Sequence, residues 1–293
     1  MPRAGIVTVA GRPNAGKSTL LNHVVGTKLA ITSAKPQSTR NRIVGIRSEG
    51  DVQMVVLDTP GLLEPKYELQ TAMRAIALEA IRDADVIIHV VDATEARVPS
   101  LVEGARLERA PSAPVLVALN KVDAISPGQR AALLEEHPEA HAVSALTGEG
   151  VDALLAAAAA RLPESAFLYP DDELSTQTLR FFVAELVRET ALEQLSDEVP
   201  YSLACEVEEF REAKRPVYIR AVLYLERDSQ KRILIGHRGS RIREIGQAAR
   251  VKIEALVEAP VYLDLWVKVL PNWRRDSRAL RRFGYHPTSE KDA

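Results

Sequence analysis

The sequence predicts an α/β fold: a mixed, mainly parallel sheet flanked by helices, followed by a smaller α+β domain. Two observations lead to this prediction. Up to about residue 161, short β-rich runs alternate with helical stretches, and most of the runs are almost continuously apolar, as expected of parallel strands buried on both faces. Beyond an acidic, proline-containing stretch, the pattern changes to helix, strand, strand, helix, helix, strand. A chain of 293 residues has room for two such domains.

Each element follows from a local pattern. In the first domain we expect strands at residues 6–10, 43–46, 52–57, 86–91, 115–119 and 140–143, and helices at 18–24, 71–82, 128–136 and 153–161. In the second we expect helices at 175–195, 229–235 and 240–258, and strands at 202–210, 216–226 and 261–269. Ser175 is the expected N-cap of the first of these helices. The predicted domains are residues 1–163 and 175–293, joined by a linker at 164–174.

Charge is distributed unevenly along the chain. The formal net charge is -2, yet the chain from Lys231 to its end carries 14 Lys and Arg against 7 Asp and Glu. Residues 1–230 carry 24 Lys and Arg against 33 Asp and Glu. A basic C-terminal part on an otherwise acidic protein indicates a polyanionic partner for that part, although a solvated basic face would give the same composition.

Composition also bears on the compartment. Cys205 is the only cysteine, which excludes an intrachain disulfide and favours a reducing compartment. The apolar strand pattern begins at residue 6, which leaves no room for a signal peptide, and no apolar run approaches the roughly 18 residues of a membrane span. The histidines at 23, 89, 137, 141 and 286 show no metal-binding spacing. A cytosolic protein is therefore expected.

The residues after the first predicted strand fit the phosphate-binding pattern G-x-x-x-x-G-K-[ST]. They read Gly11-Arg12-Pro13-Asn14-Ala15-Gly16-Lys17-Ser18, and Thr19 follows in the helix. In this pattern, backbone N–H groups at a helix N-terminus bind phosphate because their partial positive charge favours anions. Lys17 should reach the β- and γ-phosphates, and the Ser18 hydroxyl should bind Mg²⁺.

A second motif, Asp58-Thr59-Pro60-Gly61, follows the predicted strand at 52–57. The Asp58 carboxylate should hold the metal, usually through a water. The Gly61 N–H should contact the γ-phosphate, so hydrolysis should release the segment 62–70. Thr39, in the polar stretch before residue 43, is expected to be the second hydroxyl ligand of the metal, with Ser38 as the alternative.

A third motif, Asn120-Lys121-Val122-Asp123, follows the predicted strand at 115–119. The Asp123 carboxylate can accept hydrogen bonds from N1 and the exocyclic amino group of guanine, whereas adenine would leave it unpaired. Asn120 should brace the loop, and Lys121 should pack its stem against the base. A short loop is expected to complete the base site through a backbone N–H: Ser144-Ala145-Leu146. Three motifs in this order predict a switch protein that binds GTP or GDP with Mg²⁺.

Over essentially its whole length, the sequence resembles the translation-factor-related P-loop GTPases, in particular the Era/TrmE branch. The resemblance implies GTP hydrolysis in which Lys17, Thr39 and Gly61 take part. Ras-like proteins have a water-orienting glutamine at the position of Leu62. Leucine cannot orient water, so a slow intrinsic turnover is implied. In related branches, the asparagine that corresponds to Asn14 helps to hold a potassium ion that assists hydrolysis, and K⁺ at Asn14 is carried over as a hypothesis.

The second domain resembles a KH domain. Its GxxG loop, which in that family clamps the backbone of single-stranded nucleic acid, reads Ile235-Gly236-His237-Arg238-Gly239. Such a pattern arises more often as a glycine-containing turn between helices. Here the α-β-β-α-α-β order matches the type II KH fold, and basic residues surround the loop: Lys231, Arg232, Arg238, Arg241 and Arg243.

The segment 265–274 resembles the C-terminal signature of the Era branch. Trp266 alternates with apolar residues in a predicted strand, so we expect it in the core. Trp273 precedes Arg274 and Arg275 and either stacks on a base or packs in the interior. Three residues of the last predicted helical segment either contact phosphates or are solvated: Arg278, Arg281 and Arg282.

The resemblance implies a regulatory GTPase that binds small-subunit ribosomal RNA near its single-stranded 3′ end and acts in assembly of the small ribosomal subunit. A monomer in the cytoplasm is expected, with no DNA partner, and a weak peripheral contact with the inner face of the cell membrane is left open. The linker would act as the hinge of a nucleotide-dependent rearrangement. Three alternatives stay open: a GTPase acting on another RNA such as tRNA, a phosphoryl-transfer enzyme resembling nucleotide kinases, and a nonhydrolysing nucleotide binder.

Overall fold

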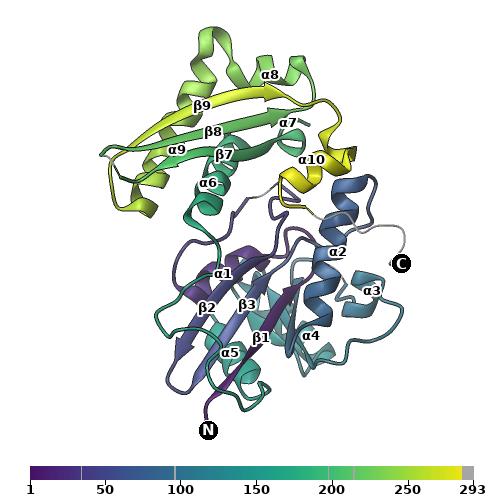
Figure 1. Cartoon of the computed structure of the whole chain (residues 1–293). Coiled ribbons are helices and arrows are strands. Elements are labelled where there is room, and N and C mark those ends of the chain that lie inside the picture. Colours follow the sequence, from purple (N-terminus) through teal and green to yellow (C-terminus); the bar gives the residue numbers. More distant parts are fainter. Residues whose placement is uncertain (34, 96, 197, 214, 286–293) are drawn as a thin grey trace. The chain divides into compact units, whose positions relative to one another are not determined.

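The computed structural model of the chain describes residues 1–33, 35–95, 97–196, 198–213 and 215–285 (Figure 1). These residues fall into two compact units. The first comprises Met1–Lys66 and Gln70–Thr176, and the second comprises Tyr67–Leu69 and the chain from Gln177 on. His286 and the end of the predicted basic tail lie outside the described residues.

Within the described residues, six strands of the first unit form one sheet in the order β2-β3-β1-β4-β5-β6. All neighbouring pairs are parallel except β2 and β3, which are antiparallel. The predicted mixed, mainly parallel sheet is thereby confirmed. The strands are β1 (Arg3–Ala10), β2 (Ile43–Glu49), β3 (Val52–Asp58), β4 (Val86–Asp92), β5 (Val115–Asn120) and β6 (His141–Val143).

Helices cover both faces of this sheet. Val44 and Thr8 lie on the face that packs against α2, where the Thr8 hydroxyl donates to the Ala80 carbonyl over 2.7 Å. Gly45 lies on the opposite face, against Leu21 of α1. Because successive side chains of a strand point to opposite faces, a sheet covered on both sides needs apolar residues at nearly every position. This explains the continuous apolar runs in the sequence.

The helices of the first unit follow the predicted order, with two differences. The α2 helix begins before the predicted residue 71, and a short helix, α3, was not predicted. Ser100 caps α3 in a reciprocal capping box with Glu103. The helices are α1 (Lys17–Val25), α2 (Glu68–Arg82), α3 (Leu101–Ala105), α4 (Pro127–Glu136) and α5 (Val151–Ala159).

The segment predicted as a linker is hydrogen-bonded to the first unit. The buried side chain of Gln53 on β3 accepts from the backbone N–H groups of Leu168 and Tyr169, over 2.7 and 3.0 Å. Further along, the Ser175 hydroxyl donates to the Val44 carbonyl over 2.5 Å. Ser175 therefore does not cap a helix. Residues 164–174 belong to the first compact unit, which extends to Thr176.

The second unit is an α+β domain built on a sheet with the order β7-β8-β9. The β7 and β8 strands are antiparallel, and β8 and β9 are parallel. Thr178, not Ser175, caps the first helix, because its side chain accepts from the Phe181 N–H. Its elements are α6 (Leu179–Gln194), α7 (Val199–Ser202), β7 (Ala204–Arg211), β8 (Val217–Leu225), α8 (Asp228–Ile235), α9 (Ser240–Val257), β9 (Val261–Val269) and α10 (Ser277–Arg282).

The core of the second unit lies between one face of this sheet and its helices. Ile219 and Leu223 of β8 point inward and pack with Val187 of α6 and Ile253 of α9. The even-numbered residues of β8 and β9 lie on the other face, which we call the outer face. The predicted α-β-β-α-α-β arrangement is thereby confirmed, with α7 as an addition and α10 as the predicted last helical segment.

Candidate functional site

The loop after β1 has the geometry of a phosphate-binding loop. It joins β1 to α1, and Gly16 precedes the helix with a φ of 97°, a left-handed conformation that favours glycine. A Cβ on Gly16 would lie 2.1 Å from the side-chain nitrogen of Asn120. The loop can therefore adopt this path only with glycine at that position, and it leaves the N–H groups of the helix start available to an anion.

Lys17 is the first residue of α1 and is buried. Its ammonium donates to the Arg12 carbonyl over 2.8 Å, which curls the side chain back over the loop. Burial lowers the pKa of Lys17 from 10.5 to about 8, and the charge of Asp58 partly offsets this shift. A phosphate beside Lys17 would favour its charged form and reverse the effect of burial.

Three predicted metal ligands lie together below this lysine. The Ser18 hydroxyl lies 2.6 Å from Asp58 Oδ2 and 2.8 Å from the Thr39 hydroxyl, and Thr39 Oγ1 lies 3.3 Å from the same carboxylate oxygen. Among the described residues, Asp58 Oδ1 is buried without a hydrogen-bond partner. Burial raises the pKa of Asp58, and the neighbouring Lys17 opposes that rise. Two hydroxyls and a carboxylate are hard oxygen donors, so this cluster fits Mg²⁺.

Thr39 and Ser38, the two candidates for the second hydroxyl ligand of the metal, differ in position. Thr39 is buried and points at Ser18 and Asp58, as described above. Ser38 lines the neighbouring cavity. The geometry therefore favours Thr39 as the switch ligand.

A cavity of about 400 Å³ lies above these groups. Predicted residues on its wall are Pro13, Asn14, Gly16, Lys17, Ser18, Thr19, Ser38, Thr39, Gly61 and Lys121. Four others were not predicted: Ile31, Thr32, Ser33 and Gln37. They come from the irregular segment after α1, where the sequence offers no motif. The sequence could have identified them only by their place between α1 and Thr39.

The segment 62–70 is packed into the core at one end, and at the other end it contacts the loop that contains Gln37 and Thr39. Leu62 is buried and packs with Ala77 and Ile81 of α2, so its side chain is a core group. The Gln70 side-chain amide donates to Gln37 over 3.0 Å. The segment 62–70, which was predicted to move, is therefore bounded by the buried Leu62 at one end and by the contact between Gln70 and Gln37 at the other.

The side chain of Asn120 joins the loops that were predicted to bind the base. Asn120 ends β5 and is buried; its amide donates to the Ala15 carbonyl over 2.8 Å and accepts from the Ala145 N–H over 2.8 Å. It thus ties the phosphate loop to the loop at Ser144-Ala145-Leu146. Asp123 is exposed in the turn after Lys121, which leaves its carboxylate available to a base.

Sequence reasoning missed Asp92, the last residue of β4. Its carboxylate lies 2.5 Å from the Lys121 ammonium. A signal was present: Asp92 ends a predicted apolar strand, just as Asp58 does. In the structure β4 and β5 are parallel neighbours that end at the same edge of the sheet, which brings Asp92 close to Lys121, the residue after β5.

The predicted nucleic-acid loop joins α8 to α9. Gly236 has φ 74° and ψ 178°, which only glycine adopts readily, and a Cβ there would lie 2.9 Å from the Arg241 nitrogen. His237 and Arg238 are exposed at the tip of the loop. The backbone is therefore open to close approach by a phosphate, with basic side chains beside it: Lys231, Arg232 and Arg241.

A groove of about 460 Å³ continues from this loop between α9 and β9. Ile235 precedes the loop and Gly239 ends it, and Gly239 is part of the groove wall. Arg243, one of the basic residues predicted around the loop, is also on the wall. The remaining wall residues were not predicted: Ile242, Gly246, Gln247, Arg250, Tyr262, Leu263 and Leu265. The apolar wall residues come from α9 and β9. In the sequence they cannot be distinguished from residues of the core, so the groove could not be predicted.

Trp266 does not lie where the sequence indicated, and Trp273 takes the interior position, one of its two predicted alternatives. Trp273 is 0% exposed, and its indole N–H donates to the Ser202 carbonyl over 2.8 Å, so it cannot stack on a base. Trp266 is 51% exposed on the outer face, so its predicted core position is wrong. Arg274 is ion-paired with Glu226 over 2.5 Å, whereas Arg275 is exposed. Of these predicted contacts, only Arg275 offers a solvated cation to a partner.

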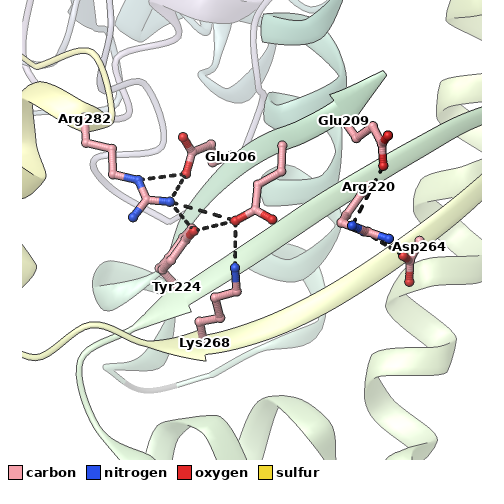
Figure 2. A network of polar contacts seen from close by, with 8 residues as sticks. Glu206, Glu209, Arg220, Tyr224, Asp264, Lys268 and Arg282 are labelled. Carbon is pink, nitrogen blue, oxygen red and sulfur yellow. Dashed lines mark hydrogen bonds and ion pairs between the residues drawn. The ribbon is translucent and has the colours of Figure 1, made fainter. Parts of the chain in front are cut away.

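Basic groups of the outer face are paired with acidic ones (Figure 2). Arg282 of α10 lies 2.7 Å from Glu206, and Arg220 lies 3.0 Å from Asp264. Lys268 pairs with a further carboxylate, Glu208. Arg282 is thus neither a free phosphate contact nor merely solvated. Among the described residues of this face, Arg220, Lys268 and Arg282 are each paired with a carboxylate, so the face offers little excess positive charge to a polyanion. Basic residues predominate instead around the loop at 235–239.

The described residues hold no cluster of three His, Cys, Asp or Glu side chains able to bind a metal, and their helices include none long and apolar enough to cross a membrane.

The fold and the two sites define a P-loop nucleotide-binding protein with a C-terminal nucleic-acid-binding domain. Residues 6–121 match the family described as 50S ribosome-binding GTPase, and residues 198–274 match the KH domain family. The GTPase Era of Pseudomonas aeruginosa is 45% identical over 293 residues, covering 97% of this chain and 95% of the relative. The GTPase Era of Pseudomonas putida is 43% identical, with coverages of 97% and 96%.

Solved structures agree with this assignment. A single-residue variant of Aquifex aeolicus Era bound to GDP and AlF4⁻ has a TM-score of 0.90 at 38% identity, covering 97% of this chain and 99% of that one. An Era in complex with MgGDPNP and nucleotides 1506–1542 of 16S ribosomal RNA has a TM-score of 0.89 at 37% identity, with coverages of 98% and 100%. The chain belongs to the GTPase Era family. It is a GTPase with a C-terminal KH domain, as its motifs predicted, and not a nucleotide kinase.

Proposed function

We propose that this GTPase couples its nucleotide state to binding of small-subunit ribosomal RNA and acts in assembly of the small ribosomal subunit. The observation that carries the proposal is the match of both domains, over 98% of the chain, to an Era in complex with MgGDPNP and a 16S ribosomal RNA fragment. The nucleotide site and the loop at 235–239 supply the chemistry that such a role needs.

The proposed phosphate site is the loop from Gly11 to Ser18. Its N–H groups and Lys17 bind the phosphates, and Ser18 and Thr39 ligate Mg²⁺ while Asp58 holds it through a water. The Gly61 N–H meets the γ-phosphate. The Ser18 and Thr39 hydroxyls lie 2.6 and 3.3 Å from Asp58 Oδ2, and this proximity supports the assignment.

The proposed guanine site is formed by Asp123, which reads the base edge, and Lys121, whose stem covers its face. Asn120 braces this loop, and a backbone N–H of the loop Ser144-Ala145-Leu146 contacts the base. The bridge from Asn120 to Ala15 and Ala145 supports a site in which base and phosphates are held by one connected frame.

Hydrolysis is proposed to be slow without help, because the buried Leu62 cannot orient water. Asn14 lines the cavity beside Lys17. If Asn14 helps to hold a potassium ion, the rate of GTP hydrolysis should be higher in K⁺ than in Na⁺ at equal ionic strength. Phosphate release measured in both salts checks this, and equal rates would remove the potassium site from the account.

For the domain organisation, we propose that residues 1–163 bind nucleotide and residues 175–293 bind RNA. The segment 164–174 lies along the first unit, so any hinge begins beyond it. We further propose a monomer in the cytoplasm whose partner is the small ribosomal subunit. The alternative location is the inner face of the cell membrane, where the protein would make a weak peripheral contact.

The RNA partner is tested by crosslinking inside cells. Wild-type chain is expected to crosslink near the 3′ end of small-subunit ribosomal RNA. Gly239→Asp places a carboxylate in the loop where a Cβ meets only Ile242 at 4.0 Å, whereas a Cβ at Gly236 would lie 2.9 Å from the Arg241 nitrogen. Both glycines have a positive φ, so both substitutions add backbone strain to the charge. Both should remove most of these crosslinks, because a like charge repels phosphate.

Gly284→Asp is the matched control. Gly284 follows α10, has a positive φ, and has open space around it, so the substitution adds the same charge far from the loop. Its crosslinks should equal those of the wild type. Crosslinks that persist in both loop variants would contradict the RNA assignment, and crosslinks mainly to tRNA would favour a GTPase that acts on that RNA.

A further inference from the structure

The turn that follows β4 is built around the Asp92 carboxylate. Asp92 Oδ1 accepts two hydrogen bonds from Thr94, one from its N–H over 3.0 Å and one from its hydroxyl over 2.7 Å. These bonds fix the turn locally, as an Asp side chain at the end of a strand commonly does. They use only one of the two carboxylate oxygens.

The second oxygen, Asp92 Oδ2, receives the Lys121 ammonium at 2.5 Å. The Asp92 side chain is only 14% exposed and that of Lys121 is 37% exposed, so this pair is sheltered more than an ordinary surface ion pair. Burial alone would raise the pKa of Asp92, but the hydrogen bonds from Lys121 and Thr94 outweigh it and lower the pKa. The carboxylate is therefore charged at neutral pH and holds the ammonium by a charge-assisted bond.

Lys121 needs such a hold because its backbone is in an unfavourable conformation. Its φ is 68°, in the left-handed region that costs a side-chain-bearing residue stability. The turn that contains Asp123 begins at the next residue, so the conformation of Lys121 sets where the Asp123 carboxylate points. A second contact fixes the same loop: the Ala93 N–H donates to the Asn120 carbonyl over 2.8 Å.

We propose that Asp92 is a positioning residue for guanine recognition. It acts through Lys121, whose stem it holds over the base and whose backbone it keeps in the conformation that aims Asp123 at the base edge. This rests on the proposed guanine site. The same turn makes a second ion pair, between Glu95 and Arg12 at 3.0 Å. Their side chains are 43% and 60% exposed, so this pair contributes little to holding the turn.

Asp92→Asn tests the proposal with minimal change to the fold. An asparagine keeps an oxygen for Thr94 but loses the charge that faces Lys121. The dissociation constant for GDP, measured by calorimetry on the full chain, should rise about tenfold, since a hydrogen bond to a charged group is lost. The preference for GDP over IDP, which lacks the 2-amino group, should shrink, because Asp123 is less well aimed. Glu95→Gln, from the same turn, should stay within about twofold of the wild type.

A double-variant cycle separates positioning from a general effect on the fold. Lys121→Met keeps the stem and removes the ammonium, so adding Asp92→Asn to it should cause little further loss of GDP affinity. Effects that multiply in the double variant would overturn the proposal. The proposal would also be overturned if the ratio of the dissociation constants for IDP and GDP were the same in Asp92→Asn as in the wild type, whether or not the melting temperature of the variant falls. Failure of the wild type to prefer GDP over IDP and ADP would instead overturn the proposed guanine site.

Discussion

Asp123→Asn is expected to weaken binding of GTP and GDP by about 10³-fold. Each of two hydrogen bonds from guanine to the carboxylate is worth about 1.5–3 kcal/mol, because the acceptor is charged. Losing or weakening both corresponds to a factor between roughly 10² and 10⁴ in affinity. Xanthine has a carbonyl where guanine has the amino group, so the asparagine amide can donate to it. Titration with GDP, XDP and ADP should therefore show XDP as the preferred ligand of the variant.

Asp152→Asn makes the same chemical change at an exposed position in α5 of the same unit. It should leave the GDP dissociation constant within about twofold of the wild type. If Asp123→Asn binds GDP nearly as well as the wild type does, the base is read by other groups and the proposed roles of residues 120–123 are wrong.

Trp273→Ala is expected to destabilise the second unit by about 3–5 kcal/mol, the range for truncation of a buried aromatic residue. The ring packs edge-on against Phe283, with centroids 5.2 Å apart, and the substitution also leaves the Ser202 carbonyl without its donor. Urea unfolding followed by far-ultraviolet circular dichroism measures the loss, because intrinsic fluorescence would change with the number of tryptophans.

Trp266→Ala is the matched control, since it removes the same side chain from the outer face. Trp266 is 51% exposed, and the Arg220 guanidinium lies over its ring at 5.9 Å from the centroid. Its removal should reduce the free energy of unfolding by no more than about 1 kcal/mol. If the Trp266 variant is the less stable of the two, the placement of both side chains is incorrect.

The two tryptophans also show where sequence reasoning about the fold fails. Trp266 alternates with Leu265 and Val267, and this pattern was interpreted as a shared core face. In a strand, however, neighbours point to opposite faces, so the inward Leu265 and Val267 place Trp266 outward. Trp273 follows the strand in a short turn, where no periodicity exists to place it. Its burial depends on a hydrogen bond to Ser202, which is 71 residues away in the sequence, and on ring packing with Phe283, which no periodic pattern relates to Trp273.

The parallel sheet could be predicted because burial on both faces leaves a local signal in every strand. The phosphate and guanine motifs could be predicted because each needs particular residues at a fixed spacing, as at Gly16 and Lys17. The segment 164–174 could not: its composition indicates a linker, but its hydrogen bonds to Gln53 and Ile46 are long-range. The groove between α9 and β9 was missed because its apolar wall residues look like core residues.

The central claim is that nucleotide state governs RNA affinity, and a direct binding measurement tests it. The full chain, loaded with Mg²⁺ and either GDP or a nonhydrolysable GTP analogue, is titrated with a 3′-terminal fragment of small-subunit ribosomal RNA at one salt concentration. We expect the dissociation constants for RNA to differ by about tenfold or more between the two nucleotide states. Two sites are coupled only if the ligand at one changes the affinity of the other for its own ligand. Equal dissociation constants would contradict it, because a nucleotide that does not change RNA affinity cannot act as a switch.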